Sequence, residues 1–80
     1  MIAKVYITLK ESILDPQGKT IMHSLESLDF EGIENVRLGK MVEIQLNTND
    51  KEKAATLVEN MCKKLLVNSV MEAYTFEILD

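Results

Sequence analysis

The sequence has little of what disulfide-bonded, metal-binding or catalytic proteins usually need. Its 80 residues include one cysteine, one histidine, one proline, three glycines and no tryptophan. A single cysteine excludes an internal disulfide and a cysteine-based metal site, and it favours a reducing compartment. No apolar run approaches the roughly 20 residues that cross a membrane, and the N-terminus lacks a signal-peptide pattern. We therefore expect a cytoplasmic protein with no membrane partner.

An excess of positive charge is also missing. Nine lysine and arginine residues face thirteen aspartate and glutamate residues, which gives a net charge of −4. Proteins that bind nucleic acid through its phosphates need clustered basic residues, so we expect no nucleic-acid partner. Eighty residues make one small domain, here residues 1–80, with a core that is marginal alone. Self-association is therefore expected.

Apolar residues are present in two clear periodicities. Alternation of apolar and polar residues predicts strands over 2–9, 33–38, 42–46 and 70–79. Helical spacing predicts helices over 16–29 and 50–67. Gly39-Lys40 separates the second and third strands, which predicts a hairpin. The order β-α-β-β-α-β predicts a single-domain α+β fold, a ferredoxin-like antiparallel sheet with two helices on one face.

Two helices can cover only one face of this sheet, and about half of the residues predicted on the other face are apolar. That proportion is high for a face in contact with water. We therefore expect a second copy of the chain to cover it, as a dimer or tetramer. The residues predicted for this self-association are Ile2, Tyr6, Met41, Met71 and Ala73.

The junction between the first strand and the first helix has a distinctive sequence. Asp15 is a favourable N-cap, and Pro16 suits the first helical position. Gly18 lies on the predicted inner stripe of the helix with Ile21 and Leu25, at a cost in helix propensity of about 1 kcal/mol. That cost predicts a close approach of another segment to the helix backbone.

Residues that could carry chemistry are few and dispersed. Gly18-Lys19-Thr20 opens a helix after a strand, as in a phosphate-binding loop, but that loop needs a glycine where Ile13 stands. His23 is predicted on the exposed side of the first helix, with no second ligand or acid partner. Cys62 is predicted to be a small buried hydrophobic residue. We therefore expect no catalytic residue and no metal site.

Arg37-Leu38-Gly39-Lys40 is the most prominent basic cluster. It is either a solvated hairpin turn or a contact with an anionic group on a partner, made by the guanidinium of Arg37 and the bare backbone at Gly39.

Several segments together resemble the PurS family, the small subunit of phosphoribosylformylglycinamidine synthase, also called formylglycinamide ribonucleotide amidotransferase. The resemblance covers nearly the whole chain. Asp-Pro-Gln-Gly followed at this separation by Arg-x-Gly-Lys is its most specific part. The matching segments are 9–12, 14–18, 36–40 and 61–68, with Val70 and Glu72.

The resemblance implies a subunit of a glutamine-dependent C–N ligase in de novo purine biosynthesis. The assembled enzyme would convert formylglycinamide ribonucleotide, glutamine and ATP to formylglycinamidine ribonucleotide, glutamate, ADP and phosphate. It implies two partners, a glutaminase subunit that makes ammonia and a large synthetase subunit that uses it with ATP and magnesium. The chain itself would hold no cofactor and no catalytic residue, and would support assembly and ammonia transfer.

The resemblance and the two unusual segments suggest a partner interface, for which the residues are Asp15, Pro16, Gln17, Gly18, Arg37, Gly39, Lys40 and Asn68. The alternative is a ligand-sensing regulatory or oligomerisation module of the same fold, which only the order of elements supports.

Overall fold

The computed structural model describes all 80 residues as three strands and two helices. The elements are β1 (Ile2–Leu9), α1 (Pro16–Ser27), β2 (Gly39–Gln45), α2 (Lys51–Met61) with a π-helical turn η1 (Cys62–Leu66), and β3 (Glu72–Leu79). The strands form one antiparallel sheet in the order β2-β1-β3. The prediction of a single α+β domain with an antiparallel sheet and two helices is confirmed. Neither helix has the length and apolarity that a membrane crossing requires.

The core lies between the sheet and α2. Alternate residues of β1, namely Ala3, Val5 and Ile7, are completely or almost completely buried, and they pack with Val58 and Cys62 of the α2–η1 helix. Half-buried side chains of β2 and β3 surround this cluster. Only eight of the 80 residues are buried, so the interior is small even for a chain of this length.

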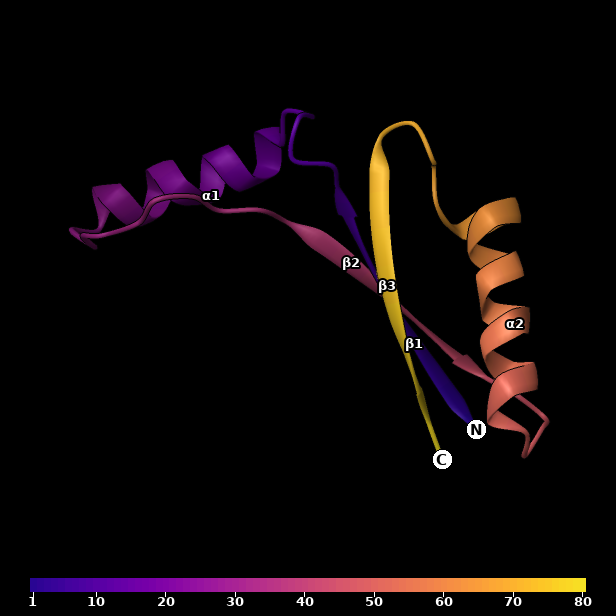
Figure 1. Ribbon diagram of the computed structural model, residues 1–80. Helices are drawn as coiled ribbons and strands as arrows, with labels where there is room; N and C mark the ends of the chain where they lie inside the picture. Colours follow the sequence, from indigo (N-terminus) through magenta and orange to yellow (C-terminus); the bar gives the residue numbers. More distant parts are fainter.

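Helix α1 does not lie on the sheet, so the prediction of both helices on one face is wrong. Helix α2 packs against β3, whereas α1 takes no part in the main contacts between elements. Figure 1 shows α1 projecting from the end of β1, away from α2. Ile21 and Leu28 of its predicted inner stripe are therefore exposed, and Met22 and Leu25 are only half-buried.

The predicted strand over 33–38 is absent, and the sheet has three strands rather than four. This segment runs back beside α1 in an extended form, with no neighbouring strand (Figure 1). Gly39 is consequently not a hairpin turn. It is the first residue of β2 and pairs with Thr8 of β1.

The second helix changes geometry near its end. Cys62 is buried as predicted, and Leu66 also packs against the core, whereas Leu65 between them is 84% exposed. The π turn at 62–66 contains more residues per turn than an α-helix, so it brings Leu66 rather than Leu65 to the inward face. The last strand, predicted over 70–79, begins only at Glu72, and Val70 is exposed in the turn before it.

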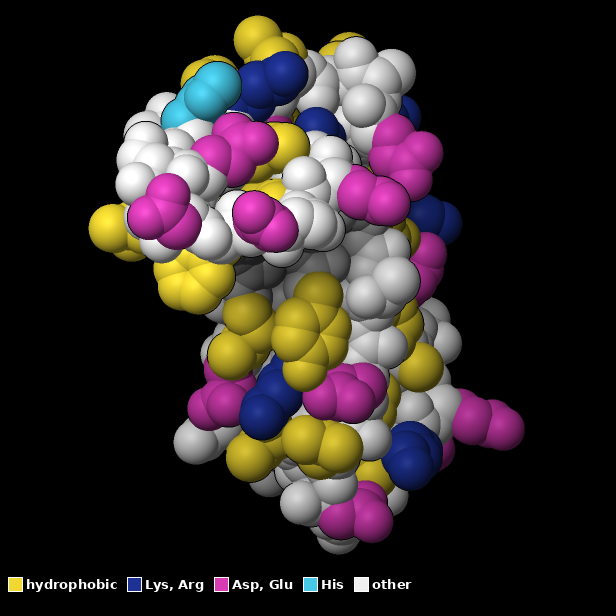
Figure 2. All heavy atoms as spheres, turned by 90° about the vertical axis from the view of Figure 1, so that its left-hand side faces the viewer, with side chains coloured by type: hydrophobic (Ala, Val, Ile, Leu, Met, Phe, Trp, Pro, Cys, Tyr) yellow, Lys and Arg dark blue, Asp and Glu magenta, His cyan; other side chains and the backbone are white.

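The sheet face opposite α2 is open. Strand pairing places Tyr6 between Met41 and Thr75, and Ile2 between Gln45 and Leu79, on this face. Figure 2 shows hydrophobic side chains mixed with charged ones below the projecting α1. The N- and C-termini lie next to each other at the far end of the sheet from α1 (Figure 1).

Candidate partner-binding site

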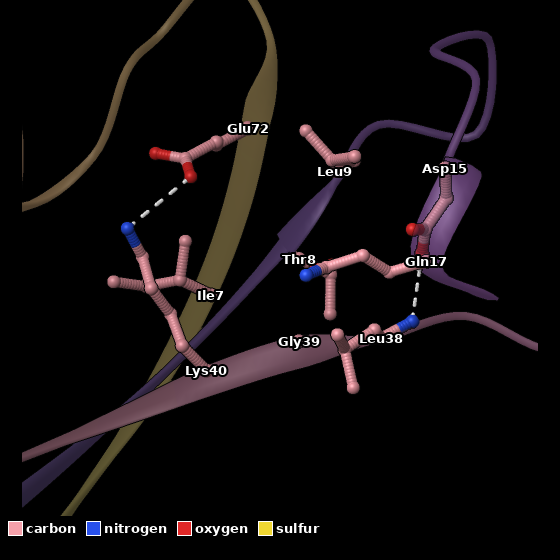
Figure 3. Close-up of a pocket in the computed structure, with 9 residues that line it drawn as sticks. All are labelled: Ile7, Thr8, Leu9, Asp15, Gln17, Leu38, Gly39, Lys40 and Glu72. Carbon is pink, nitrogen blue, oxygen red and sulfur yellow. Dashed lines mark hydrogen bonds and ion pairs between the residues drawn. The ribbon is translucent and has the colours of Figure 1, made fainter. Parts of the chain in front are cut away.

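Most of the predicted interface residues meet where β1 ends and where α1 and β2 begin. Asp15, Gln17, Gly39 and Lys40 line a pocket of about 320 Å³ there. The other lining residues come from β1, the start of β3 and the residue before β2 (Figure 3); they are Ile7, Thr8, Leu9, Leu38 and Glu72. The structure thus brings together two sequence segments that were singled out separately.

Asp15 is the structural centre of this junction. It has extended backbone geometry, as an N-cap residue should, and it is buried. Its Oδ1 accepts a hydrogen bond from the Gly18 N–H (2.9 Å), and its Oδ2 accepts one from the Leu38 N–H (2.7 Å). The Leu38 N–H, followed by the Gly18 N–H, holds the pKa of the Asp15 carboxyl below its usual value, and the charge of Arg37 acts in the same direction.

Gly18 has the close contact that the sequence predicted. A Cβ at this position would collide with the carbonyl oxygen of Val36, and would also lie 2.9 Å from Oδ2 of Asp15. The returning segment therefore passes against the first turn of α1 at a distance that only glycine allows. This contact lies within the chain, so the glycine is already explained by the fold.

Arg37 has a role that was not predicted. Its Nη2 donates hydrogen bonds to the carbonyl oxygens of Leu9 (3.2 Å), Lys10 (2.8 Å) and Ile13 (3.1 Å). The alternative that placed Arg37 in a solvated hairpin turn is therefore wrong. The 10–15 segment has few backbone partners of its own, and a guanidinium is suited to satisfying several carbonyl groups at once. No sequence signal indicated this role, because Arg37 lay in the segment predicted as a strand over 33–38.

Gln17 and Lys40 remain available to a partner. Both are exposed, and the Gln17 side chain is directed into the pocket with no hydrogen bond to the chain (Figure 3). The Lys40 ammonium lies 3.5 Å from the Glu72 carboxylate, and its side chain is 60% exposed. The Glu72 side chain is only 19% exposed, so the exposed Lys40 is the member of the pair that a partner can reach.

Asn68 lies outside the pocket but is connected to it. Its side chain accepts a hydrogen bond from the Val70 N–H (3.0 Å), and its own N–H donates to Oε1 of Glu72 (2.8 Å). The Asn68 N–H, with a smaller effect of Lys40, lowers the pKa of the Glu72 carboxyl. Asn68 therefore forms the turn before β3 and orients the carboxylate that faces Lys40. Pro16 occupies the first position of α1 and is exposed.

The remaining candidate residues are dispersed. His23 is exposed on α1, and its Nδ1 lies 3.8 Å from the Glu26 carboxylate. Cys62 is buried, and burial raises the pKa of its thiol. No three metal-ligating side chains converge in the chain. Tyr74 donates a 2.6 Å hydrogen bond to Glu59, which joins β3 to α2 and raises the pKa of Tyr74 to about 12.

The first prediction concerns Gly18. Replacing an interior helix glycine with alanine usually stabilises a helix by up to about 1 kcal/mol. Gly18→Ala should instead destabilise the domain by about 2 kcal/mol, because the new methyl group collides with the Val36 carbonyl. Urea unfolding would measure the change. Lys19→Ala, at the next and exposed position of α1, is the control and should change stability little.

The second prediction concerns the charge of Asp15. A lowered pKa means that the ionised carboxylate stabilises the folded state above the ordinary pKa near 4, and that this contribution is lost as pH falls through the lower, folded-state pKa. Asp15→Asn should therefore be much less stable than the wild type at pH 7, and the gap should narrow below about pH 4. Thermal unfolding at several pH values, with the exposed Asp29→Asn as control, measures it. A gap independent of pH would contradict this role.

Comparisons with known proteins agree with this architecture. The sequence model of the PurS family, described as phosphoribosylformylglycinamidine (FGAM) synthase, matches residues 2–80. The PurS subunit of phosphoribosylformylglycinamidine synthase from Bacillus subtilis is 44% identical over 75 residues, covering 94% of this chain and 88% of that protein. The Synechocystis subunit is 40% identical, covering 94% and 75%.

Solved structures give the same result. PurS of B. subtilis has a TM-score of 0.83 at 42% identity, covering 99% of this chain and 98% of that one. PurS of Methanocaldococcus jannaschii has a TM-score of 0.85 at 39% identity, covering 95% and 92%. A chain in the PurLQS structure of Thermotoga maritima has a TM-score of 0.83 at 32% identity, covering 99% of both. The chain belongs to the PurS family of phosphoribosylformylglycinamidine synthase subunits.

Proposed function

We propose that this chain is an assembly subunit, which joins the glutaminase subunit to the ATP-dependent synthetase subunit and supports ammonia transfer between them. The observation that carries the proposal is the likeness, over 99% of both chains, to a chain in the PurLQS structure of T. maritima. The ATP and magnesium chemistry then belongs to the synthetase subunit. As a subunit of a purine-biosynthesis ligase, the chain would work in the cytoplasm.

Ammonia transfer gives the assembly a physical purpose. Ammonia released into water becomes protonated and can no longer attack an electrophile, so it has to move through a passage that excludes water. Two enzyme subunits can enclose such a passage only if their relative position is fixed. A third chain that contacts both would supply this positioning without any catalytic group of its own.

The junction pocket is the surface that we assign to these partners. Gln17 offers an amide donor and acceptor that nothing in the chain uses, and Lys40 offers an exposed ammonium group that is paired only with Glu72, at 3.5 Å. Asp15, Gly18, Arg37 and Asn68 contribute by shaping the backbone around these two side chains. Asp15 and Arg37 are consequently poor probes of the interface, since their replacement disturbs the fold.

The third prediction tests this surface with Gln17→Ala. One buried hydrogen-bonding side chain contributes about 1 to 1.5 kcal/mol, so complex formation should weaken roughly tenfold. The glutamine-dependent rate of the reconstituted enzyme should fall more than the ammonia-dependent rate. Asn60→Ala, an exposed amide on α2, is the control. Equal affinities and unchanged rates in both assays for Gln17→Ala would remove Gln17 from the interface.

Self-association through the open sheet face is the second part of the proposal. The Cα radius of gyration is 16.1 Å, whereas a compact domain of this length has about 12 Å. Tyr6, Met41 and Met71 are each at least 42% exposed on or beside this face, and Ile2 and Ala73 lie on it as well. An elongated chain with a small core and an apolar open face gains stability when a second copy covers that face.

The fourth prediction therefore concerns Met41. Met41→Lys places a charge in the proposed interface, which should weaken self-association by about 3 kcal/mol, or roughly a hundredfold. Sedimentation velocity at micromolar concentration should show the oligomer of the wild type and a smaller species for the variant. Leu65→Lys, at an equally apolar and 84% exposed position on η1, should keep the oligomer. A monomeric wild type would contradict the proposal.

A further inference from the structure

Residues 16–36 form an arm that stands away from the rest of the molecule. The arm consists of α1 and the segment that returns beside it, and it projects from the end of the sheet (Figure 1). The molecule is 48 Å along its longest axis and 15 Å along its shortest. Helix α1 has no part in the main contacts between elements, so packing on the sheet does not determine where the arm points.

Two short passages of chain connect the arm to the sheet. The first, residues 10–15, leads from β1 into α1, and the second, residues 37–38, leads from the returning segment into β2. Two peptide connections without cross-links would let the arm swing as a unit. Here the two passages are joined by side chains, and these joins are concentrated on Asp15 and Arg37.

Arg37 makes the more extensive of these joins. It belongs to the second passage, and its three carbonyl acceptors extend from the last residue of β1 through the first passage to Ile13. All three bonds are made by Nη2, so carbonyl groups spread over residues 9–13 surround one atom of the second passage and restrain where that passage lies relative to the first. Asp15 adds one further join, to the Leu38 N–H.

We propose that Arg37 is a positioning residue that fixes the direction of the 16–36 arm relative to the sheet. Its guanidinium ties the end of β1 and the first passage to the second passage, so the arm and the sheet move as one body. The direction of the arm decides where α1 and the exposed residues Ile21 and Leu28 are presented. This role is internal to the chain and does not depend on the partner subunits.

Residual dipolar couplings of backbone amides, measured by NMR on the full chain, test this directly. In the wild type, amides of α1 and of the three strands should fit one alignment tensor. Arg37→Gln removes the charge and most donors. In this variant the α1 couplings should fit a separate alignment tensor, whose magnitude is at least a third smaller than that of the strands. Hydrogen exchange at the Leu38 N–H should become at least tenfold faster. The strand couplings should keep their wild-type tensor.

Two further variants separate positioning from a general loss of stability. Lys19→Gln removes the same charge from an exposed site on the arm and should behave as the wild type. Arg37→Lys keeps the charge and donors on a shorter side chain and should restore part of the α1 couplings. The proposal is wrong if α1 and the strands of Arg37→Gln still share one tensor of unchanged size. It is equally wrong if the strand couplings in Arg37→Gln are lost together with those of α1.

Discussion

The structure depends on one carboxylate that serves two segments at once. Asp15 caps the first turn of α1 through Gly18 and holds the start of β2 through Leu38. Because the two acceptor atoms belong to one rigid group, the helix start and the strand start cannot move independently. The absence of a side chain at Gly18 allows the same convergence, since Val36 occupies the space that a Cβ would need. The pocket with Gln17 and Lys40 exists because these segments meet.

The rest of the domain is held together by a small core between the sheet and α2. Val58 and Cys62 cover the buried residues of β1, and the Tyr74–Glu59 hydrogen bond joins β3 to the same helix. The sheet and α2 thus form the packed part of the molecule. The junction and α1 form a second part, in which the helix makes few packing contacts with the other elements. A chain with so few buried residues has a low free energy of unfolding, and burial of its exposed apolar surfaces against another chain would raise it.

The sequence predicted the features that depend on residues close together in the chain. It did not predict features that depend on contacts with distant residues. Alternation located β1 and β3, helical spacing located both helices, and the helix cost of Gly18 correctly indicated a close contact. The alternation over 33–38 was wrongly interpreted as a strand. Alternation shows that one face of an extended segment is apolar and the other polar, but it does not show that another strand pairs with the segment. A uniform helix was predicted over 50–67, and its helical spacing gave no sign of the π turn at 62–66.

The candidate site was predicted as two separate segments and as contacts, but not as a pocket. Its geometry depends on Arg37 reaching carbonyl groups 24 to 28 residues away, and no local pattern encodes those partners. Arg37 also shows that a basic residue without an evident local role need not be a contact with a partner. An arginine that no local element needs can still be required by a loop elsewhere in the chain.

Because its termini are adjacent, the chain is suited to circular permutation. Ile2 and Leu79 are paired neighbours at the end of the sheet remote from the junction. A few added residues could therefore connect the two ends, and the chain could be opened elsewhere without disturbing Asp15 or Arg37. A carrier domain or label attached at either end would likewise be held away from the pocket, whichever end was chosen.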